Sequence, residues 1–198
     1  QGVENPEGTI FAIGRDAGVP HSVGNPTDPL RLGQTIVYDI YPCQAGGGYF
    51  YDFTRTWSLG YATDEVQALY DQVKQVYDTL FAELKLNARF SDYQERTCEL
   101  FEAMGHPTVK TNPVTEVGYV HSLGHGIGLR VHEKPWSSTI NSSPTDVLIP
   151  GTVFTLEPGL YYPDKGMGVR IEDSIQVTPD GRFEILADYP KDLVLPIK

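Results

Sequence analysis

Residues 121–133 contain three of the chain's five histidines, His121, His125 and His132, interleaved with three glycines. Imidazole titrates near neutral pH and is the commonest metal ligand among side chains, so this clustering favours chemistry over packing. Glycines in a strand-like pattern also let another group approach the backbone closely. A single histidine here would be better explained as a residue without a functional role in a glycine-containing strand. Four acidic residues elsewhere change that interpretation.

Two aspartates are expected to face each other across a hairpin. A strand expected over 35–41 carries Asp39, and a strand expected over 49–57 carries Asp52. If the glycine-rich turn between them is centred on residues 45–46, the two aspartates lie directly opposite each other. Like charges directly opposite each other destabilise a sheet, and a cation bound between them offsets this repulsion.

Two glutamates repeat this arrangement later in the chain. The strand expected over 152–157 ends in Glu157, and the return strand over 168–177 carries Glu172. A proline–glycine turn between the strands places Glu157 opposite Glu172, with Arg170 on the same face as Glu172. The second hairpin therefore predicts a second pair of opposed carboxylates.

The two hairpins share their organisation, which indicates an internal duplication with the site between the halves. Gly33 precedes Asp39 by six residues, as Gly151 precedes Glu157. A histidine also precedes each hairpin, His21 in the first half and the last histidine of the 121–133 stretch in the second.

Two helices are expected to position the second hairpin. Residues 64–85 carry apolar side chains at helical spacing after Thr63, a suitable N-cap. A second helix over 91–104 is expected to start with a capping box completed by Gln94. Nothing helical is expected before the first hairpin. We therefore expect residues 1–198 to form one catalytic domain that begins inside its natural boundary and lacks its first helical pair.

Composition excludes several classes of protein. The chain has 198 residues, is 40% hydrophobic and carries a formal net charge of −11, which suits one domain with a sizeable core and argues against a nucleic-acid partner. It lacks an apolar run long enough to span a membrane. Cys43 and Cys98 form no disulfide or zinc pattern, which suggests a reducing compartment, the cytoplasm.

The candidate ligands are two aspartates, two glutamates and one histidine: Asp39, Asp52, His125, Glu157 and Glu172. An oxygen-rich set without thiolates suits a two-metal centre of Mn²⁺, Co²⁺, Fe²⁺ or Zn²⁺. Paired cations about 3.5–4 Å apart lower the pKa of a water and stabilise a tetrahedral oxyanion. The expected reaction is metal-assisted hydrolysis.

The segments around these residues resemble the five ligand motifs of the pita-bread metallopeptidases, a family that includes methionine aminopeptidase, aminopeptidase P and prolidase. The motifs are Asp39, Asp-Phe-Thr-Arg-Thr from Asp52, His125, Leu-Glu-Pro-Gly around Glu157 and Arg-Ile-Glu-Asp around Glu172. The likeness covers residues from about 9 to about 180. A histidine four residues before His125 is similar to the aminopeptidase P and prolidase branch.

The resemblance implies an α+β pita-bread fold and hydrolysis of the bond before proline in a short peptide with proline in second position. It implies two divalent ions, Mn²⁺ first, with Asp52 and Glu172 bridging them. Asp39 would complete one metal site, and His125 with Glu157 the other.

The resemblance also implies roles around the metals. Glu157, His132 and His121 are the expected catalytic residues, with Glu157 carrying the proton of the bridging water. His132 would hydrogen-bond the substrate, while His21, His121 and Arg170 would surround the proline side. For Arg170, a role as a hydrogen-bonding partner of Glu172 is an equal alternative.

Alternatives remain open at the level of sequence. A methionine aminopeptidase is the second enzymatic interpretation, and a binding module that kept the fold without the chemistry is the other. The choice between aminopeptidase P and prolidase is open, as is assembly into a homodimer or with a missing N-terminal segment. Residues 40–48 replace the family's short Asp-x-Gly-Ala turn and put the pocket rim in doubt.

Overall fold

The computed structural model describes residues 2–140 and 142–197; Gln1, Asn141 and Lys198 lie outside them. In chain order the elements are β1 Val3–Glu4, β2 Thr9–Ile13, the 3-10 turn η1 Asp16–Gly18, β3 Thr35–Ile40, β4 Cys43–Gln44, β5 Phe53–Leu59, α1 Asp64–Glu83, α2 Phe90–Ala103, β6 His125–Gly126, β7 Glu133–Trp136, β8 Val153–Leu156, β9 Gly159–Tyr162, the 3-10 turn η2 Pro163–Lys165, β10 Met167–Arg170, β11 Asp173–Val177, β12 Phe183–Ile185 and β13 Val194–Leu195. The strands of the two hairpins form separate sheets, and the C-terminal strand β13 joins the sheet of the first hairpin.

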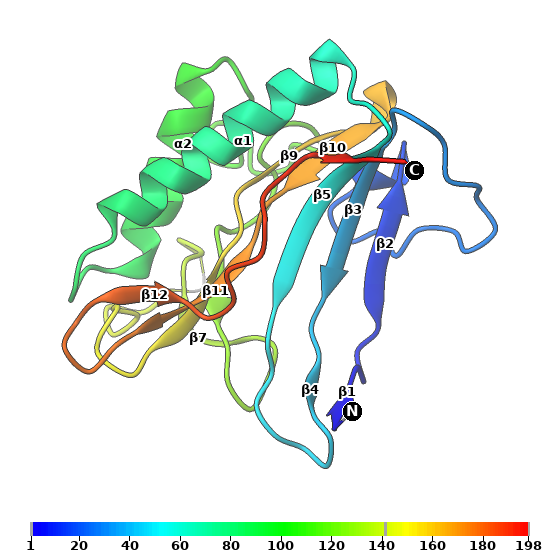
Figure 1. Ribbon diagram of the computed structural model, residues 1–198. Coiled ribbons are helices and arrows are strands. Elements are labelled where there is room, and N and C mark those ends of the chain that lie inside the picture. The colour runs from blue at the N-terminus through cyan, green and yellow to red at the C-terminus, as the bar shows by residue number, and fades with distance from the viewer. Residues whose placement is uncertain (1, 141, 198) are drawn as a thin grey trace.

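The first half is a four-stranded sheet in the order β13-β5-β3-β2, at the right of Figure 1. The predicted register of its hairpin is wrong by two residues, because Asp39 pairs with Thr54 and not with Asp52. The chain turns one residue later than expected, with Gln44 N–H donating to Tyr49 O at 3.2 Å. A shift by two residues preserves the faces of a strand, so both aspartates still point to the same side.

The second hairpin has the predicted register but is divided between two sheets. Its outer parts, β8 and β11, belong to the five-stranded sheet β12-β11-β8-β6-β7, and its inner parts, β9 and β10, pair alone. Leu156 pairs with Asp173, and Gly159 pairs with Arg170. Glu157 and Glu172 lie in the gap between these pairs, in the register expected. There the Glu172 N–H donates to Thr54 O at 3.1 Å, which joins the two halves.

The two halves share one backbone detail. Gly33 and Gly151 both have left-handed backbones, with φ of 76° and 89°. The Gly33 N–H donates to Leu59 O at 3.0 Å and the Gly151 N–H donates to Val177 O at 2.8 Å, in each case at the end of the returning strand. Glycine is the residue that takes this conformation at little cost. The expected duplication is therefore visible in the hydrogen bonding.

The helices form as expected, apart from one cap. The Thr63 side chain accepts a hydrogen bond from Val66 N–H at the start of α1. Helix α2 starts at Phe90 after Arg89, which makes no side-chain cap, so the predicted capping box is wrong. Gln94 is buried and turned away toward residues 119–123. In the described part of the chain, no α-helix precedes the first hairpin.

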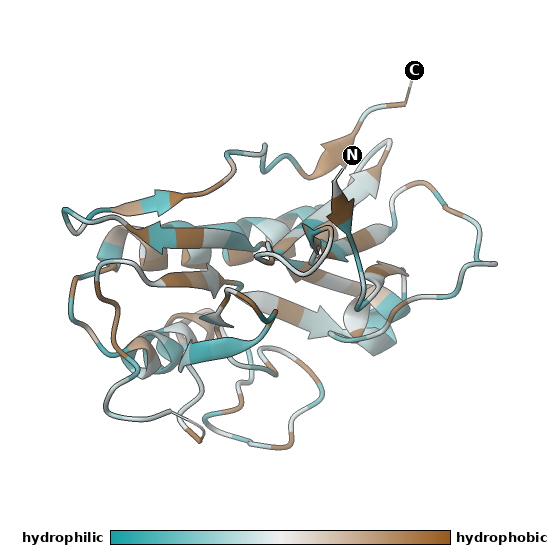
Figure 2. Ribbon diagram, turned by 90° about the horizontal axis from the view of Figure 1, so that it is seen from below, coloured by the Kyte–Doolittle hydropathy of each residue, from teal (hydrophilic) through white to brown (hydrophobic). Residues whose placement is uncertain are grey.

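The main core lies between the helices and the strands of the second half. Helix α1 packs against β9 and β10, beside the first sheet, and α2 packs against α1 and β7 (Figure 1). Fully buried residues from both layers include Val73, Leu80, Phe101, Phe154 and Leu160. Hydrophobic and hydrophilic bands alternate along the strands, as half-buried sheets require (Figure 2). Among the described residues, the helices are too short or too polar to cross a membrane.

Candidate metal centre

A cavity of about 350 Å³ opens between the two halves. It is lined by Glu7, Ile10, His21, Val23, Asp39, Tyr41, Asp52, His121, Ser122, His125, His132, Trp136, Glu157, Arg170 and Glu172. All nine side chains predicted from the sequence are in this set. The first hairpin supplies the aspartates and the second supplies the glutamates, so the cavity depends on both halves.

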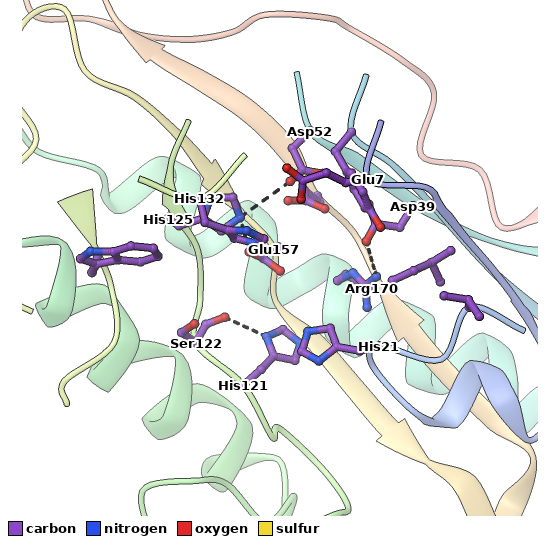
Figure 3. A pocket seen from close by; sticks show the side chains of 15 residues that line it. Glu7, His21, Asp39, Asp52, His121, Ser122, His125, His132, Glu157 and Arg170 are labelled. Carbon is purple, nitrogen blue, oxygen red and sulfur yellow. Dashed lines mark hydrogen bonds and ion pairs between the residues drawn. The ribbon is translucent and has the colours of Figure 1, made fainter. Parts of the chain in front are cut away.

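Three potential ligands form the centre of the cavity. One donor atom each of Asp52, His125 and Glu172 lies within 4.8 Å of the other two. His125 Nε2 is 3.7 Å from Asp52 Oδ2 and 3.5 Å from Glu157 Oε1 (Figure 3). Asp39 lines the same cavity but is engaged by Arg170 and does not join this closest group.

His125 is held in the tautomer that a metal ligand needs. Its Nδ1–H donates to Gly126 O at 3.0 Å, which leaves the Nε2 lone pair facing the carboxylates. Burial, followed by the nearby His132, lowers the pKa of His125 to about 4, so the ring is neutral at neutral pH. A Cβ at Gly124 would overlap Thr155 O, and one at Gly126 would overlap Lys134 O. The glycines therefore allow the close packing expected of this stretch.

The carboxylates repel one another in the absence of a cation. Burial, with the charge of Asp39, raises the pKa of Asp52, and burial, with the charge of Asp52, raises the pKa of Glu172. Burial also raises the pKa of Glu157 to about 8. Asp39 Oδ1 is buried and lacks a hydrogen-bond partner among residues 2–140 and 142–197. One imidazole and several under-compensated carboxylates fit a hard or borderline divalent cation.

Arg170 connects the two halves through Asp39. Its Nη2 is 2.7 Å from Asp39 Oδ2, and its Nη1 donates to Tyr161 Oη at 2.8 Å. It reaches Glu172 only indirectly, because Nε donates to Thr54 Oγ1, which in turn donates to Glu172 Oε2 at 2.6 Å. Arg170 therefore supports Glu172 through Thr54 and does not pair with it directly.

The other three histidines of the cavity occupy two sides of it (Figure 3). His21 and His121 lie together near Arg170, whereas the His132 ring centroid is 4.3 Å from that of His125. The His121 ring bonds Ser122 O and Tyr161 Oη, each at 2.8 Å. His132 and His21 are solvent-exposed and can meet a ligand.

Several residues that shape the site were not predicted. Gln94 accepts hydrogen bonds from Tyr119 Oη and from Leu123 N–H, and donates to His121 O, so it fixes the segment before His125. Its position three residues after Ser91 concealed this role by imitating a capping box. Thr54 was visible inside the Asp-Phe-Thr motif, whereas Glu7 and Trp136 gave no recognisable signal.

Comparison with known proteins agrees with these features. Residues 1–179 match metallopeptidase family M24. The chain is 35% identical over 188 residues to "Putative dipeptidase YkvY" of Bacillus subtilis (strain 168), covering 94% of this chain and 47% of that protein. The family resemblance expected from the motifs is confirmed.

Solved structures give the same result for the fold. The prolidase from Pyrococcus horikoshii OT3 superposes with a TM-score of 0.79 at 30% identity, over 93% of this chain and 48% of that one. The X-Pro aminopeptidase from Thermotoga maritima MSB8 also gives 0.79, at 31% identity over 94% and 49%. The α+β pita-bread prediction is confirmed, and the chain spans about half the length of the relatives it matches.

Proposed function

We propose, from the premise that this chain belongs to metallopeptidase family M24, that residues 1–198 form a metal-dependent catalytic domain that hydrolyses the peptide bond before proline. The observation that carries the proposal is the convergence of all nine predicted side chains on one cavity. The relatives named prolidase and X-Pro aminopeptidase support the same substrate class. The cavity volume, about 350 Å³, suits a short peptide.

Two divalent cations, Mn²⁺ first, are the proposed cofactors. Asp52 and Glu172 would be shared between them, since both carboxylates belong to the group of donor atoms that lie within 4.8 Å of one another. Asp39 would complete one position, and His125 with Glu157 the other. When bound, such cations lower the pKa of a water and polarise a carbonyl.

The protein's own groups would then move protons and orient the substrate. Glu157 lies beside His125, and burial raises its pKa to about 8. It is our candidate for the group that takes a proton from the attacking water. His132 is exposed to the cavity and would hydrogen-bond the substrate near the scissile carbonyl.

The side of the cavity lined by His21, His121 and Arg170 is proposed to receive the proline ring and its carboxyl side. The bond before proline is a tertiary amide and offers no N–H, so a peptidase that needs this donor handles it poorly. Activation of the water and the carbonyl does not require it. Arg170 already donates to Thr54, Pro20, Tyr161 and Asp39, so it would contribute mainly through its positive charge.

A comparison of matched peptides tests the specificity. Loaded with Mn²⁺, the protein is expected to cleave Ala-Pro with a kcat/KM at least about tenfold above that for Ala-Ala, equivalent to about 1.4 kcal/mol. His121→Ala should reduce this ratio more than it weakens metal binding. Ala-Pro and Ala-Pro-Ala together separate a dipeptidase from an aminopeptidase.

Two other outcomes would replace the proposal. A higher kcat/KM for Met-Ala than for Ala-Pro would favour the methionine aminopeptidase interpretation. Failure of the metal-loaded protein to cleave any of these peptides would favour a binding module. A binding module that still holds two ions would be recognised by elemental analysis.

We also propose a reducing compartment, the cytoplasm, for this reaction. Cys43 and Cys98 are both buried and both free thiols. Unpaired buried cysteines are usual where glutathione and thioredoxin keep thiols reduced. Fractionation of the producing cell would test this, and recovery of the protein outside the cell would contradict it.

A further inference from the structure

Arg55 is fully buried behind the candidate metal centre, and all five of its N–H donors are used. Nη1 donates to Thr54 O at 2.9 Å and to Glu172 O at 2.7 Å, and Nη2 donates to Asp173 Oδ1 at 2.7 Å. The remaining donors reach the C-terminal segment, at Tyr189 O and Pro190 O. An arginine has five N–H donors in a fixed planar arrangement, so this side chain is completely satisfied.

Asp173 receives this guanidinium together with two further donors. Its Oδ2 accepts from Tyr77 Oη of helix α1 at 2.5 Å and lies 2.7 Å from Lys191 Nζ. Side-chain exposure is 1% for Arg55, 0% for Asp173 and 15% for Lys191. The positive side chains of Arg55 and Lys191 therefore share the single buried carboxylate of Asp173. This leaves an excess of positive charge behind the acidic cavity.

The same stretch of chain aligns two of the candidate ligands. Ser174 Oγ accepts from Asp52 N–H at 3.2 Å and donates to Asp52 O at 2.9 Å. Thr54 holds Glu172 through both its carbonyl and its hydroxyl. In the sequence Asp173 lies between Glu172 and Ser174, and Arg55 directly follows Thr54, so the Arg55–Asp173 ion pair is adjacent to both connections. It therefore holds together the segments that carry Asp52 and Glu172.

We propose that Arg55, Asp173 and Lys191 form a positioning network that sets the separation of the Asp52 and Glu172 carboxylates and thereby the affinity of the site for metal. This inference rests on the proposed function, because it takes those carboxylates as ligands. Supporting residues of this kind commonly change metal affinity by about 10–100-fold when they are replaced. The network also makes the C-terminal segment part of the site's support, through Lys191 and through the carbonyls of Tyr189 and Pro190.

Arg55→Lys tests the network with the charge retained. The dissociation constant for Co²⁺, measured by chelator competition well below the unfolding temperature, should rise about 10–100-fold, with a changed d–d absorption spectrum. Lys191→Met is a milder variant at a more exposed position and should weaken binding less. Arg96→Lys is the matched control, since Arg96 pairs with Glu83 on the helix surface, where each side chain is 40% exposed. Its dissociation constant should equal that of the wild type.

A second readout does not depend on metal. The Glu172 amide, which donates to Thr54 O, should exchange its hydrogen at least about tenfold faster in Arg55→Lys, while the central amides of α1 are unchanged. If Arg55→Lys does not fold, Lys191→Met decides both measurements. Unchanged Co²⁺ affinity and unchanged Glu172 exchange, with only a lower unfolding temperature, would reduce the network to a structural role and overturn the inference. Failure of the wild type to bind Co²⁺ would instead count against the proposed function, and amide exchange alone would decide the positioning role.

Discussion

The first hairpin turns through Gly46 and Gly47, whereas the second turns through Pro163 and Gly166. Gly46 and Gly47 have φ of 87° and 90° and nothing near enough to restrict them. In the second turn, Pro163 fixes its own φ, and the left-handed Gly166 donates its N–H to Pro163 O at 3.0 Å. A proline with one left-handed glycine admits few turn geometries, while a run of glycines admits many. The second turn therefore sets its register locally, and the first depends on pairing elsewhere in the sheet.

The halves also differ in what covers them. Helices α1 and α2 bury the strands of the second half. The face of the first sheet that points away from the cavity carries aromatic side chains, with Tyr38 and Trp57 stacked at 5.7 Å. Phe11 beside them is 43% exposed, and Tyr189 is 46% exposed. The described residues thus give the glutamates a covered scaffold and the aspartates a partly open one.

The largest expected effect tests whether the halves are equal partners in chemistry despite this difference. Asp52→Asn and Glu172→Gln should each abolish metal-dependent hydrolysis, since each removes a carboxylate from the centre of the candidate ligand group. Elemental analysis should show loss of metal in both. Glu184→Gln on β12, outside the cavity, is the control and should keep metal and activity. Retention of both by Asp52→Asn alone would show that only the second half is functional.

The next effect separates two histidines of the second half. His132→Ala should leave metal content nearly unchanged and lower kcat about 10²–10⁴-fold, the usual contribution of a positioned proton-transfer or hydrogen-bonding group. His125→Ala should release metal, because its Nε2 faces the carboxylates. Metal analysis and kinetics on the same samples test both. Equal metal loss in the two variants would mean that their roles are misassigned.

Sequence reasoning succeeded where residue type allows one geometry. The second register followed from Pro163 and Gly166, and the α1 start from Thr63. It failed where several solutions were compatible with the residues. The glycines of the first turn permit a shift of two residues, and Gln94 has the spacing of a capping box yet binds residues 119–123.

The carboxylates and histidines of the site could be predicted from the sequence because such residues in these motifs have few other roles. The residues that hold them in position could not be predicted in this way. Thr54 and Arg55 meet Glu172 and Asp173 only through contacts between the halves, more than a hundred residues apart in the chain. The alternation of residues within one strand does not predict a contact with a distant strand. Such a partner can be identified only from the three-dimensional structure.

A smaller effect compares His21 and His121, which lie on the side of the cavity proposed to receive proline. Burial, followed by the Arg170 guanidinium, lowers the pKa of His121 to about 3, below the value of 6.5 for an unperturbed ring. The unfolded chain takes up a proton as pH falls through 6.5, while the folded chain does not, so stability is present above that pH and is lost toward pH 3. At pH 5 the His121 ring alone should contribute a loss of about 1–2 kcal/mol in the metal-free protein, while His125 adds to the total pH dependence and Glu157 opposes it.

Urea unfolding at pH 7 and pH 5, compared between the wild type and His121→Gln, measures the contribution of His121. His121→Gln should reduce the pH dependence by the same about 1–2 kcal/mol. His21→Gln, in the first half, should change it less, because His21 is exposed to solvent. If His21→Gln and His121→Gln changed the pH dependence of stability equally, the two histidines would not differ in this respect.

The smallest effect concerns the equivalent glycines that begin the two hairpins. Alanine at Gly151 meets nothing within 4 Å, so its cost is the left-handed backbone alone, about 1–2 kcal/mol. At Gly33 the added Cβ would also lie 2.7 Å from the Tyr61 ring, which must move. Tyr61 is 54% exposed and can do so, so the additional cost should be below about 1 kcal/mol. Gly33→Ala is therefore expected to destabilise slightly more than Gly151→Ala in urea unfolding, and Tyr61→Ala combined with Gly33→Ala should restore equality. If Gly33→Ala still destabilises more than Gly151→Ala when the Tyr61 ring is absent, the backbones at these two glycines differ in energy. The two halves would then share their topology alone.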